Sequence, residues 1–419
     1  MTAFHYRDGT LYAEDVSVEQ TARTVQTPFY LYSERQIRSQ MRAFTEAAAR
    51  HLPFFTVCFA LKSNANLSVI RLIASMGGGA DIVSGGELLL ALKAGIAPEK
   101  IVFSGVGKTR EELTLAVEKG IGQINLESAE EADMLEEIAL KAGKKVRVAV
   151  RVNPDVDAHT HQKITTGKKE NKFGVAWESA RPLYRRLAQS EVLLPVGLDV
   201  HVGSQLLETE PFAAAFDRAA GIVEALKADG IRLETIDVGG GLGVAYRESD
   251  APCSVDAYMK TVADRLGKTG CRIIFEPGRF LIAPAGVLVS RVVRVKHTPE
   301  KDFLVLDAGM NDLIRPAIYD AYHGVKPVKE GKAVKAYDVV GPVCESSDVF
   351  GKGRMLPEMK AGDPVVLETA GAYGSSMGSN YNFRPLCAEV LVNGDEFAII
   401  RNRQTFEDIS ALNVVAPWL

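Results

Sequence analysis

The stretch that decides the fold is Phe54-Phe55-Thr56-Val57-Cys58-Phe59-Ala60-Leu61-Lys62, an apolar run of strand-forming residues that ends on a lysine. A run of this length, rich in aromatic residues and bounded by polar ones, predicts a buried β-strand. Similar short apolar runs recur up to about residue 280, and segments with helical periodicity separate them. This alternation is typical of a parallel sheet built from strand–helix units.

Eight such strands can be counted. They are predicted at residues 54–60, 80–83, 101–104, 123–126, 146–152, 197–202, 236–238 and 273–275. Eight strand–helix units predict an α/β fold, a closed (β/α)8 TIM barrel. Three of the intervening helices are expected to begin at capping boxes, formed by Ser84 with Glu87, Thr109 with Glu112 and Ser128 with Glu131. Because its capping box gives Glu87 a structural role, we do not expect Glu87 to be catalytic.

Beyond about residue 283 the apolar residues recur with a period of two, as in residues 288–295, which indicates β-strands. Asn393-Gly394 between two such runs predicts a hairpin, and Asp8-Gly9 predicts another near the N-terminus. A second, all-β domain, a sandwich or small barrel, is therefore expected after the TIM barrel. The expected domains are the barrel over residues 30–282 and the all-β domain over residues 283–419, completed by residues 1–29.

Composition narrows the class of protein. The chain has 419 residues, 47% of them hydrophobic and 24% charged, and a formal net charge of -4, which is an ordinary balance for a globular protein of two domains. It offers no basic stripe for nucleic acid and no apolar run long enough to span a membrane. Its five cysteines are scattered, with no C-x-x-C pair, and the first residues do not form a secretory signal. We expect a cytoplasmic protein that acts on a small molecule.

Chemically distinctive residues follow the predicted barrel strands, at the edge where TIM-barrel active sites lie. They are Lys62, Asp81, His201 with Ser204, the triple glycine 239–241, and Glu276-Pro277-Gly278-Arg279. A lysine carried by a buried strand can lose its proton through desolvation and condense with an aldehyde. The glycines would let backbone N–H groups approach a phosphate. Each residue taken alone also has an ordinary structural explanation, as a surface lysine, a core histidine, a flexible turn or a salt-bridged arginine.

Three other patterns are set aside. Gly105-Val106-Gly107-Lys108-Thr109 lacks the earlier glycine of a phosphate-binding P-loop, and the segment 239–244 lacks the last glycine of a dinucleotide fingerprint, so neither ATP nor NAD is expected. Four residues of metal-ligand type alternate with other residues along one loop. Because successive side chains of an extended segment point to opposite sides, we expect no metal site there. This set is Asp155, Asp157, His159 and His161.

Taken in order, Lys62, His201-Val202-Gly203-Ser204, the triple glycine and Glu276-Pro277-Gly278-Arg279 resemble the motifs of the alanine-racemase-like, fold-type III pyridoxal phosphate decarboxylases. The resemblance runs from about residue 25 to 410. Within that family, four further segments look like those of the diaminopimelate decarboxylases: residues 153–161, 315–319, 341–348 and 370–374.

The resemblance implies that the cofactor is pyridoxal 5'-phosphate, carried as an aldimine on Lys62, with Glu276 at the pyridine nitrogen and His201 stacked on the ring. The cofactor-binding residues that it implies are Lys62, Asp81, His201, Ser204, Gly240, Glu276, Pro277, Gly278, Arg279 and Tyr373. The substrate-binding residues that it implies are Arg279, Arg315, Tyr319, Glu345 and Tyr373. It also implies a homodimer with shared active sites, in which Cys344 and Glu345 enter the partner's site and Cys344 donates a proton.

The activity implied is decarboxylation of meso-2,6-diaminopimelate to L-lysine and CO2, the last step of lysine biosynthesis. Decarboxylation of another carboxylate-bearing amino acid, carrier-linked or a siderophore precursor, is the first alternative, although Arg315 and Glu345 suit both distal groups of diaminopimelate. An amino-acid racemase would favour a cationic partner at the pyridine nitrogen, so Glu276 argues against it. A non-catalytic pyridoxal phosphate carrier would not need the second domain.

Overall fold

The computed structural model describes residues 3–154 and 172–419, so that Asp155, Asp157, His159 and His161 lie outside the described residues. The chain divides into two compact units. The barrel unit comprises Gln40–Val244 and Ala251–Phe280, and the β unit comprises Met1–Ser39, Ala245–Asp250 and Leu281–Leu419. The chain passes from the β unit to the barrel unit within α2 (Glu34–His51), enters the β unit briefly at Ala245–Asp250, and returns to it within α10 (Arg279–Ile282).

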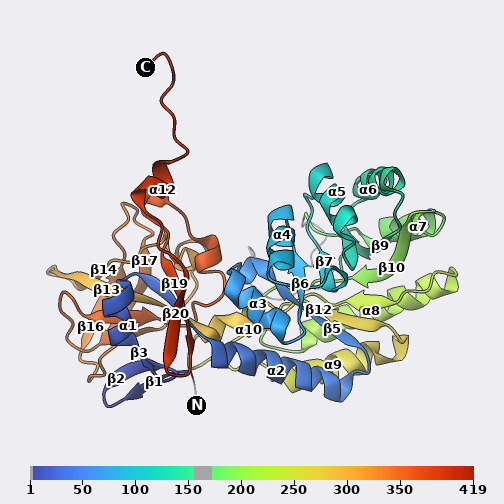
Figure 1. Cartoon of the computed structure of the whole chain (residues 1–419). Helices are drawn as coiled ribbons and strands as arrows, with labels where there is room; N and C mark the ends of the chain where they lie inside the picture. Colours follow the sequence, from blue (N-terminus) through green and yellow to red (C-terminus); the bar gives the residue numbers. More distant parts are fainter. Residues whose placement is uncertain (1–2, 155–171) are drawn as a thin grey trace. The chain divides into compact units, whose positions relative to one another are not determined.

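The described part of the barrel unit holds eight parallel strands in a closed barrel, in which each strand pairs with the next and β12 pairs with β5 (Figure 1). The strands are β5 (Phe55–Ala60), β6 (Gly79–Ile82), β7 (Ile101–Phe103), β8 (Gln123–Leu126), β9 (Val146–Arg151), β10 (Leu193–Asp199), β11 (Thr235–Asp237) and β12 (Arg272–Phe275). The helices between them are α3 (Leu67–Ser75), α4 (Gly85–Lys93), α5 (Arg110–Lys119), α6 (Ala129–Ala142), α7 (Trp177–Leu187), α8 (Glu210–Ala228) and α9 (Val255–Leu266). The predicted (β/α)8 barrel is confirmed, although β10 begins earlier than the sequence indicates.

Only one of the three expected capping boxes is complete. Thr109 Oγ1 accepts from the backbone N–H of Glu112, and the Glu112 carboxylate accepts from the backbone N–H of Thr109. At the other two helices the serine caps as expected, but the glutamate accepts from the residue before the serine, Val83 in one case and Glu127 in the other. The predicted capping boxes at α4 and α6 were therefore wrong about the glutamate's partner, because each glutamate side chain accepts from a backbone N–H one residue before the capping serine.

The β unit is built on a nine-stranded sheet within the described residues. Its strands are β4 (Phe29–Ser33), β13 (Gly286–His297), β14 (Asp302–Leu306), β15 (Val325–Pro327), β16 (Lys335–Val340), β17 (Val349–Leu356), β18 (Pro364–Leu367), β19 (Ala388–Asn393) and β20 (Glu396–Arg401). Strand β4, from the N-terminal part of the chain, lies between β13 and β19, with Leu31 opposite Val287 on one side and Val390 on the other. All five of its residues are buried.

Both predicted hairpins are present in the β unit. Asn393 pairs with Glu396 across one turn, and Arg7 pairs with Thr10 across the other. The N-terminal hairpin forms a separate three-stranded sheet of β1 (Phe4–Arg7), β2 (Thr10–Ala13) and β3 (Val16–Ser17), which α1 (Val18–Val25) follows. Two short helices complete the unit, α11 (Arg315–Tyr319) and α12 (Phe406–Ser410).

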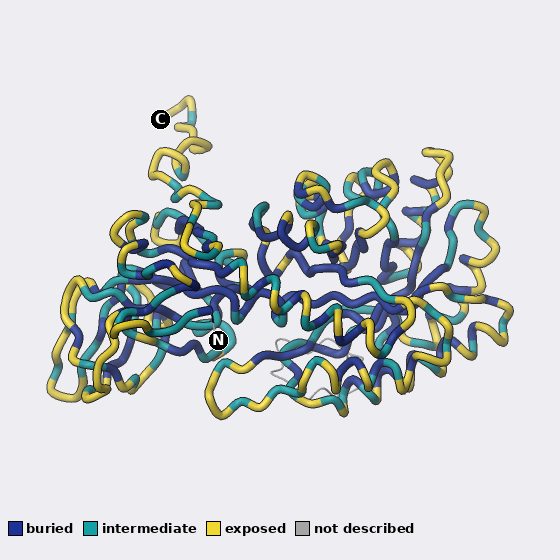
Figure 2. Tube along the Cα trace, turned by 60° about the horizontal axis from the view of Figure 1, so that its bottom comes forward, coloured by how far each residue is buried: buried dark blue, intermediate teal, exposed yellow. Residues whose placement is uncertain are grey.

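The strands of the barrel are mostly buried, and so is β4 in the β unit, whereas the helices of the barrel unit alternate between buried and exposed residues and the edge strand β20 holds no buried residue (Figure 2). Helix α6 is an example, since Ala132, Leu135 and Ile138 are buried at helical spacing while Leu140 is exposed. No helix in residues 3–154 or 172–419 has the length and apolar character that a membrane crossing requires.

Candidate functional site

Lys62 lies two residues beyond the end of β5, on a single 3-10 turn formed by Leu61–Ser63. Its Nζ is 2.9 Å from Oδ2 of Asp81, which β6 carries and whose side chain is fully buried. The Lys62 side chain is 40% exposed. Desolvation therefore does not set the chemistry of this lysine as the sequence suggested. The ion pair with Asp81 instead directs the amine to one place at the barrel mouth.

Glu276 directly follows β12 and is buried. Ser104 Oγ donates to Glu276 Oε1 at 3.3 Å, and Asn125 Nδ2 donates both to Ser104 Oγ at 3.1 Å and to Asp237 Oδ2 at 3.2 Å. Burial, and after it the neighbouring Asp237, raises the pKa of Glu276 well above its usual range. A cationic nitrogen placed beside Glu276 would lower that pKa and favour the carboxylate.

A chain of hydrogen bonds runs along the barrel interior toward this glutamate. Thr235 Oγ1 donates to Gln123 Oε1 at 2.7 Å, and Gln123 Nε2 donates to Asn125 Oδ1 at 2.8 Å. Asn125 then donates to Ser104, which donates to Glu276. Every donor in the chain points the same way, so the chain orients Glu276 and stabilises negative charge on it.

The triple glycine follows β11 and packs against His201 and the backbone of Glu276. A Cβ on Gly239, whose φ is +64°, would lie 2.3 Å from His201 Nδ1, and one on Gly240 would lie 2.4 Å from the carbonyl oxygen of Glu276. No side chain fits at either position, and the backbone N–H of Gly239 donates to Asp237 Oδ1 at 3.0 Å. The backbone N–H of Gly240 donates to His201 Nδ1 at 3.4 Å.

His201 lies two residues beyond the end of β10. Its surroundings in the barrel unit, first burial and then the charges of Arg151 and Lys62, lower its pKa well below the usual range. The imidazole is therefore neutral near pH 7, and its Nδ1 can accept the hydrogen bond from Gly240. A neutral flat ring suits stacking on another flat ring.

Ser204, Pro277, Gly278 and Arg279 stand near these residues in the chain. Gly278 packs closely against Ser63, because a Cβ on it would lie 2.9 Å from the Ser63 Cβ. Arg279 is 9% exposed and begins α10. Arginine forks favour carboxylate and phosphate groups.

The sequence analysis did not predict a second set of buried charged residues at the barrel mouth. Arg151, at the end of β9, donates from Nη1 to Glu127 Oε1 at 3.0 Å, and its Nε is 3.9 Å from Oδ2 of Asp199. Burial, and then Asp237, raises the pKa of Asp199 well above its usual range. Together with Asp81, Asp237 and Glu276, Asp199 makes the barrel interior rich in carboxyl groups.

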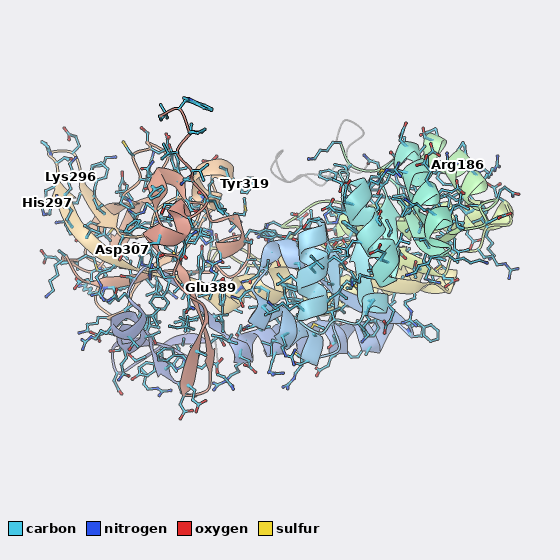
Figure 3. The ribbon with its side chains drawn as sticks, turned by 45° about the horizontal axis from the view of Figure 1, so that its top comes forward. Arg186, Lys296, His297, Asp307, Tyr319 and Glu389 are labelled. Atoms are coloured by element: carbon cyan, nitrogen blue, oxygen red, sulfur yellow. The ribbon has the colours of Figure 1, made fainter. Side chains whose placement is uncertain are left out.

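The remaining predicted site residues belong to the β unit. Arg315 begins α11 and is 7% exposed, and Tyr319, labelled in Figure 3, ends the same helix and is half-buried. The Arg315 guanidinium carbon lies 4.8 Å from the centre of the Tyr246 ring. Tyr373 has a φ of +56°, a left-handed conformation that is uncommon for a bulky residue and is often found at functional sites.

Cys344 and Glu345 are exposed on the loop between β16 and β17. Asp348 shapes this loop, since its carboxylate accepts from the backbone N–H groups of Met310 and Val343, each at 2.7 Å. The backbone N–H of Cys344 donates to Asn382 Oδ1 at 2.9 Å, and Tyr381 donates to Glu345 at 3.3 Å.

The structure thus gathers Lys62, Asp81, His201, the triple glycine and Glu276 at the carboxyl ends of the barrel strands. The β unit carries Arg315, Tyr319, Cys344, Glu345 and Tyr373 on its own helix and loops. Sequence reasoning missed Ser104, Asn125, Asp237, Arg151 and Asp199. Gln123 and Asn125, two polar residues alternating in an otherwise apolar strand, were a signal that could have been read.

Comparison with known proteins decides the family. A family model described as "Pyridoxal-dependent decarboxylase, pyridoxal binding domain" matches residues 34–283. A diaminopimelate decarboxylase from Zymomonas mobilis is 46% identical over 423 residues, which cover 100% of both chains. The chain belongs to the diaminopimelate decarboxylases. The one from Pseudomonas aeruginosa is also 46% identical, again over 100% of both chains.

Solved structures of diaminopimelate decarboxylases agree with this assignment. The one from M. jannaschii in complex with L-lysine has a TM-score of 0.94 and 37% identity, and the match covers 100% of this chain and 99% of that one. The Helicobacter pylori one with L-lysine has a TM-score of 0.91 and 43% identity, over 94% and 98% of the two chains. The predicted family, the barrel with its β domain and the carboxy-lyase class are confirmed, and pyridoxal 5'-phosphate is the cofactor.

The residues at the barrel mouth fit pyridoxal phosphate. Within residues 3–154 and 172–419, the buried Oδ1 of Asp81, beside Lys62, has no hydrogen-bond partner, so a polar atom of the site is left for a ligand to satisfy. The cradle at Gly239 and Gly240 admits no side chain, so a phosphate could approach the backbone closely there, although the N–H groups of these two glycines already donate to Asp237 Oδ1 and to His201 Nδ1. Glu276 is a buried carboxyl group whose negative charge a neighbouring cation would balance.

Proposed function

We propose that this chain decarboxylates meso-2,6-diaminopimelate at its D-configured carbon, giving L-lysine and CO2. The observation that carries the proposal is the identity of 46% to diaminopimelate decarboxylases over the full length of both chains, which includes the β unit as well as the cofactor barrel. A chain that shared only the barrel would support no particular substrate.

Lys62 would hold the cofactor covalently through its amine, from the position that Asp81 fixes. When bound, pyridoxal phosphate supplies a ring that accepts the electron pair released by loss of CO2. Glu276 would hold a proton on the ring nitrogen, and His201 would lie against the ring face. Gly240, Ser204 and the backbone of Glu276 to Arg279 would bind the phosphate.

The substrate carries two amines and two carboxylates, and only the carboxylate at the reacting carbon is lost, so the site must recognise the amine and the carboxylate at the other, distal end. We assign the distal carboxylate, which remains in the product, to Arg279, Arg315 and Tyr319, whose donors suit it, and the distal amine to Glu345. Tyr373 would contact both substrate and cofactor. The reacting carboxylate needs no such clamp, because an unpaired and partly apolar setting favours loss of its charge as CO2.

Cys344 would return a proton to the carbon that has lost CO2. We propose that it does so in the site of a second subunit, so that the working form is a homodimer with shared active sites. Its exposed position, next to exposed Glu345, is compatible with reaching another subunit. All five cysteines are free, which supports a reducing compartment, and we propose that the enzyme works in the cytoplasm.

The test supplies pyridoxal phosphate and measures CO2 and lysine release from meso-diaminopimelate, beside the LL-isomer, L-lysine, L-ornithine and L-arginine. We expect release from the meso compound alone. If none of these compounds releases CO2 while the cofactor is bound through Lys62, meso-diaminopimelate is rejected as the substrate, and a decarboxylase of another carboxylate-bearing amino acid is favoured.

A further inference from the structure

Arg315 has a buried neighbour to which neither the sequence analysis nor the proposed function gives a role. His323 is 0% exposed, and its Nε2 lies 2.9 Å from Nη1 of Arg315. Its Nδ1 lies 2.7 Å from the carbonyl oxygen of Glu368. Both contacts lie within the β unit.

These two contacts fix the protonation of the ring. A carbonyl oxygen can only accept, so Nδ1 carries the proton and donates to Glu368. A guanidinium can only donate, so Nε2 carries none and accepts from Arg315. His323 is therefore neutral while both bonds are made. It directs the guanidinium without adding a negative charge, whereas a carboxylate in its place would compete with an anionic ligand for the same cation.

The segment that holds His323 is itself tightly fixed. The backbone N–H of Glu368 donates to the carbonyl oxygen of Gly324 at 2.8 Å, so Glu368 is bonded to both His323 and its neighbour. A Cβ on Gly324 would lie 2.3 Å from Oε2 of Glu368, so a larger residue there would have to displace the end of the Glu368 side chain. The imidazole is thus attached to the backbone that follows β18.

One aromatic ring completes the arrangement. Tyr246 lies edge-on to His323, with ring centres 5.5 Å apart, and its ring also faces the Arg315 guanidinium. One tyrosine ring therefore contacts both Arg315 and His323, and the guanidinium keeps few alternative orientations. A long side chain loses less freedom on binding when it is already positioned.

We propose that His323 is a positioning residue that sets the Arg315 guanidinium for the carboxylate that remains on the substrate, and thereby determines selection for ligands that carry this carboxylate. The inference rests on the proposed function, which assigns that carboxylate to Arg315. His323 contacts no reacting atom in this role, so its loss weakens binding of the distal carboxylate more than it slows the chemical step.

The experiment compares two substitutions of similar size. In His323→Asn the amide nitrogen takes the place of Nδ1 and can still donate to Glu368, but the side chain is too short to reach Arg315. In His323→Gln the amide oxygen takes the place of Nε2 and can accept from Arg315. His297→Asn is the matched control, since His297 lies at the end of β13 with its side chain 65% exposed (Figure 3).

Binding to the holoenzyme is measured by calorimetry with L-lysine, which retains the carboxylate, and with cadaverine, which lacks it. We expect His323→Asn to weaken L-lysine binding by about 10-fold to 100-fold, the effect of losing a hydrogen bond to a charged group, and to change cadaverine binding by less than about twofold. His323→Gln should retain most of the L-lysine affinity, and the KM for meso-diaminopimelate should follow the same order with kcat changed less.

Arg315→Ala separates failure of this inference from failure of the proposed function. If His323 acts through Arg315, adding His323→Asn to Arg315→Ala should not weaken L-lysine binding further. Weakening by Arg315→Ala together with unchanged binding in His323→Asn would overturn the inference alone. Unchanged L-lysine binding in Arg315→Ala would instead overturn the substrate assignment of Arg315. Equal losses for L-lysine and cadaverine in His323→Asn would indicate a merely structural role and also overturn the inference.

Discussion

Glu87 shows how burial of a single carboxyl group affects stability. Burial raises its pKa to about 6 from an ordinary value of 4.5, although its carboxylate accepts from the backbone N–H of Val83 at 2.7 Å. The folded state therefore binds this proton more tightly than the unfolded state. The stabilising contribution of the protonated group is present below about pH 4.5 and is lost as the pH rises through about 6.

Glu87→Gln should remove this dependence, because the amide oxygen can still accept from Val83 and has no charge to desolvate. We expect the variant to be more stable than the wild type by up to about 2 kcal/mol at pH 7.5 and nearly equal to it at pH 4. Urea unfolding at the two pH values measures the difference. Glu130→Gln is the control, since hydrogen bonds to its own backbone N–H and to Ser128 lower the pKa of Glu130, and it should not stabilise the protein at pH 7.5.

Asn125 allows a second test at this scale. Asn125→Leu would leave Asp237 and Ser104 without their shared donor, and a buried polar group without a partner costs about 1–3 kcal/mol. We expect lower stability and a dissociation constant for pyridoxal phosphate raised about tenfold, because Glu276 loses the oriented hydroxyl of Ser104. Absorbance titration with the cofactor measures this constant. Thr235→Val, at the far end of the same hydrogen-bond chain, should leave it unchanged, and an equal effect of both variants would contradict the role of Asn125.

Single residues of the site could be predicted to the extent that they follow a strand. Lys62, His201 and Glu276 were expected at the carboxyl edge of the barrel because each comes directly after an apolar run. The bonds that join Ser104, Asn125 and Asp237 could not be predicted, because they connect three different strands. Whether Lys62 would be desolvated was equally inaccessible, since its 40% exposure depends on side chains remote in the sequence.

At the scale of the element, prediction succeeded where the signal is local. The hairpins at Asp8-Gly9 and Asn393-Gly394 could be predicted from the turn residues alone. The eight barrel strands could be predicted because each alternates with a helical segment. Strand β4 was not anticipated. Its run Phe29-Tyr30-Leu31-Tyr32 is short, and its two partner strands lie far along the chain.

The central place of β4 gives a prediction. Leu31 is 0% exposed and packs in a core cluster with Val287 and Val390. Leu31→Ala should cost about 2–5 kcal/mol, the usual range for removing a buried leucine side chain. Ile399→Ala, on strand β20 at the edge of the same sheet and 50% exposed, should change stability by less than about 1 kcal/mol. Guanidinium unfolding compares the two, and equal losses would show that β4 does not hold the sheet together.

At the scale of the whole molecule, the proposed shared site can be tested with two inactive variants. Lys62→Ala lacks the cofactor lysine and Cys344→Ala lacks the proposed proton donor, so each alone should be nearly inactive. If the two residues of one site come from different subunits, a mixed dimer contains one intact site. Equal mixing after dissociation and reassociation should therefore restore about a quarter of wild-type activity. Activity is measured after mixing, and each variant mixed with itself is the control. Failure to regain activity would reject the shared site.

The position of β4 also affects when each part of the chain can fold during synthesis. The barrel unit ends at Phe280, so all of its strands can emerge from the ribosome before the rest of the β unit exists. Strand β4 emerges among the first residues, yet its neighbours β13 and β19 follow roughly 250 and 360 residues later. Throughout that interval an apolar strand remains unpaired on the nascent chain. Slow translation of the last third of the message should thus lengthen exposure to aggregation and increase dependence on chaperones, while the barrel is already formed.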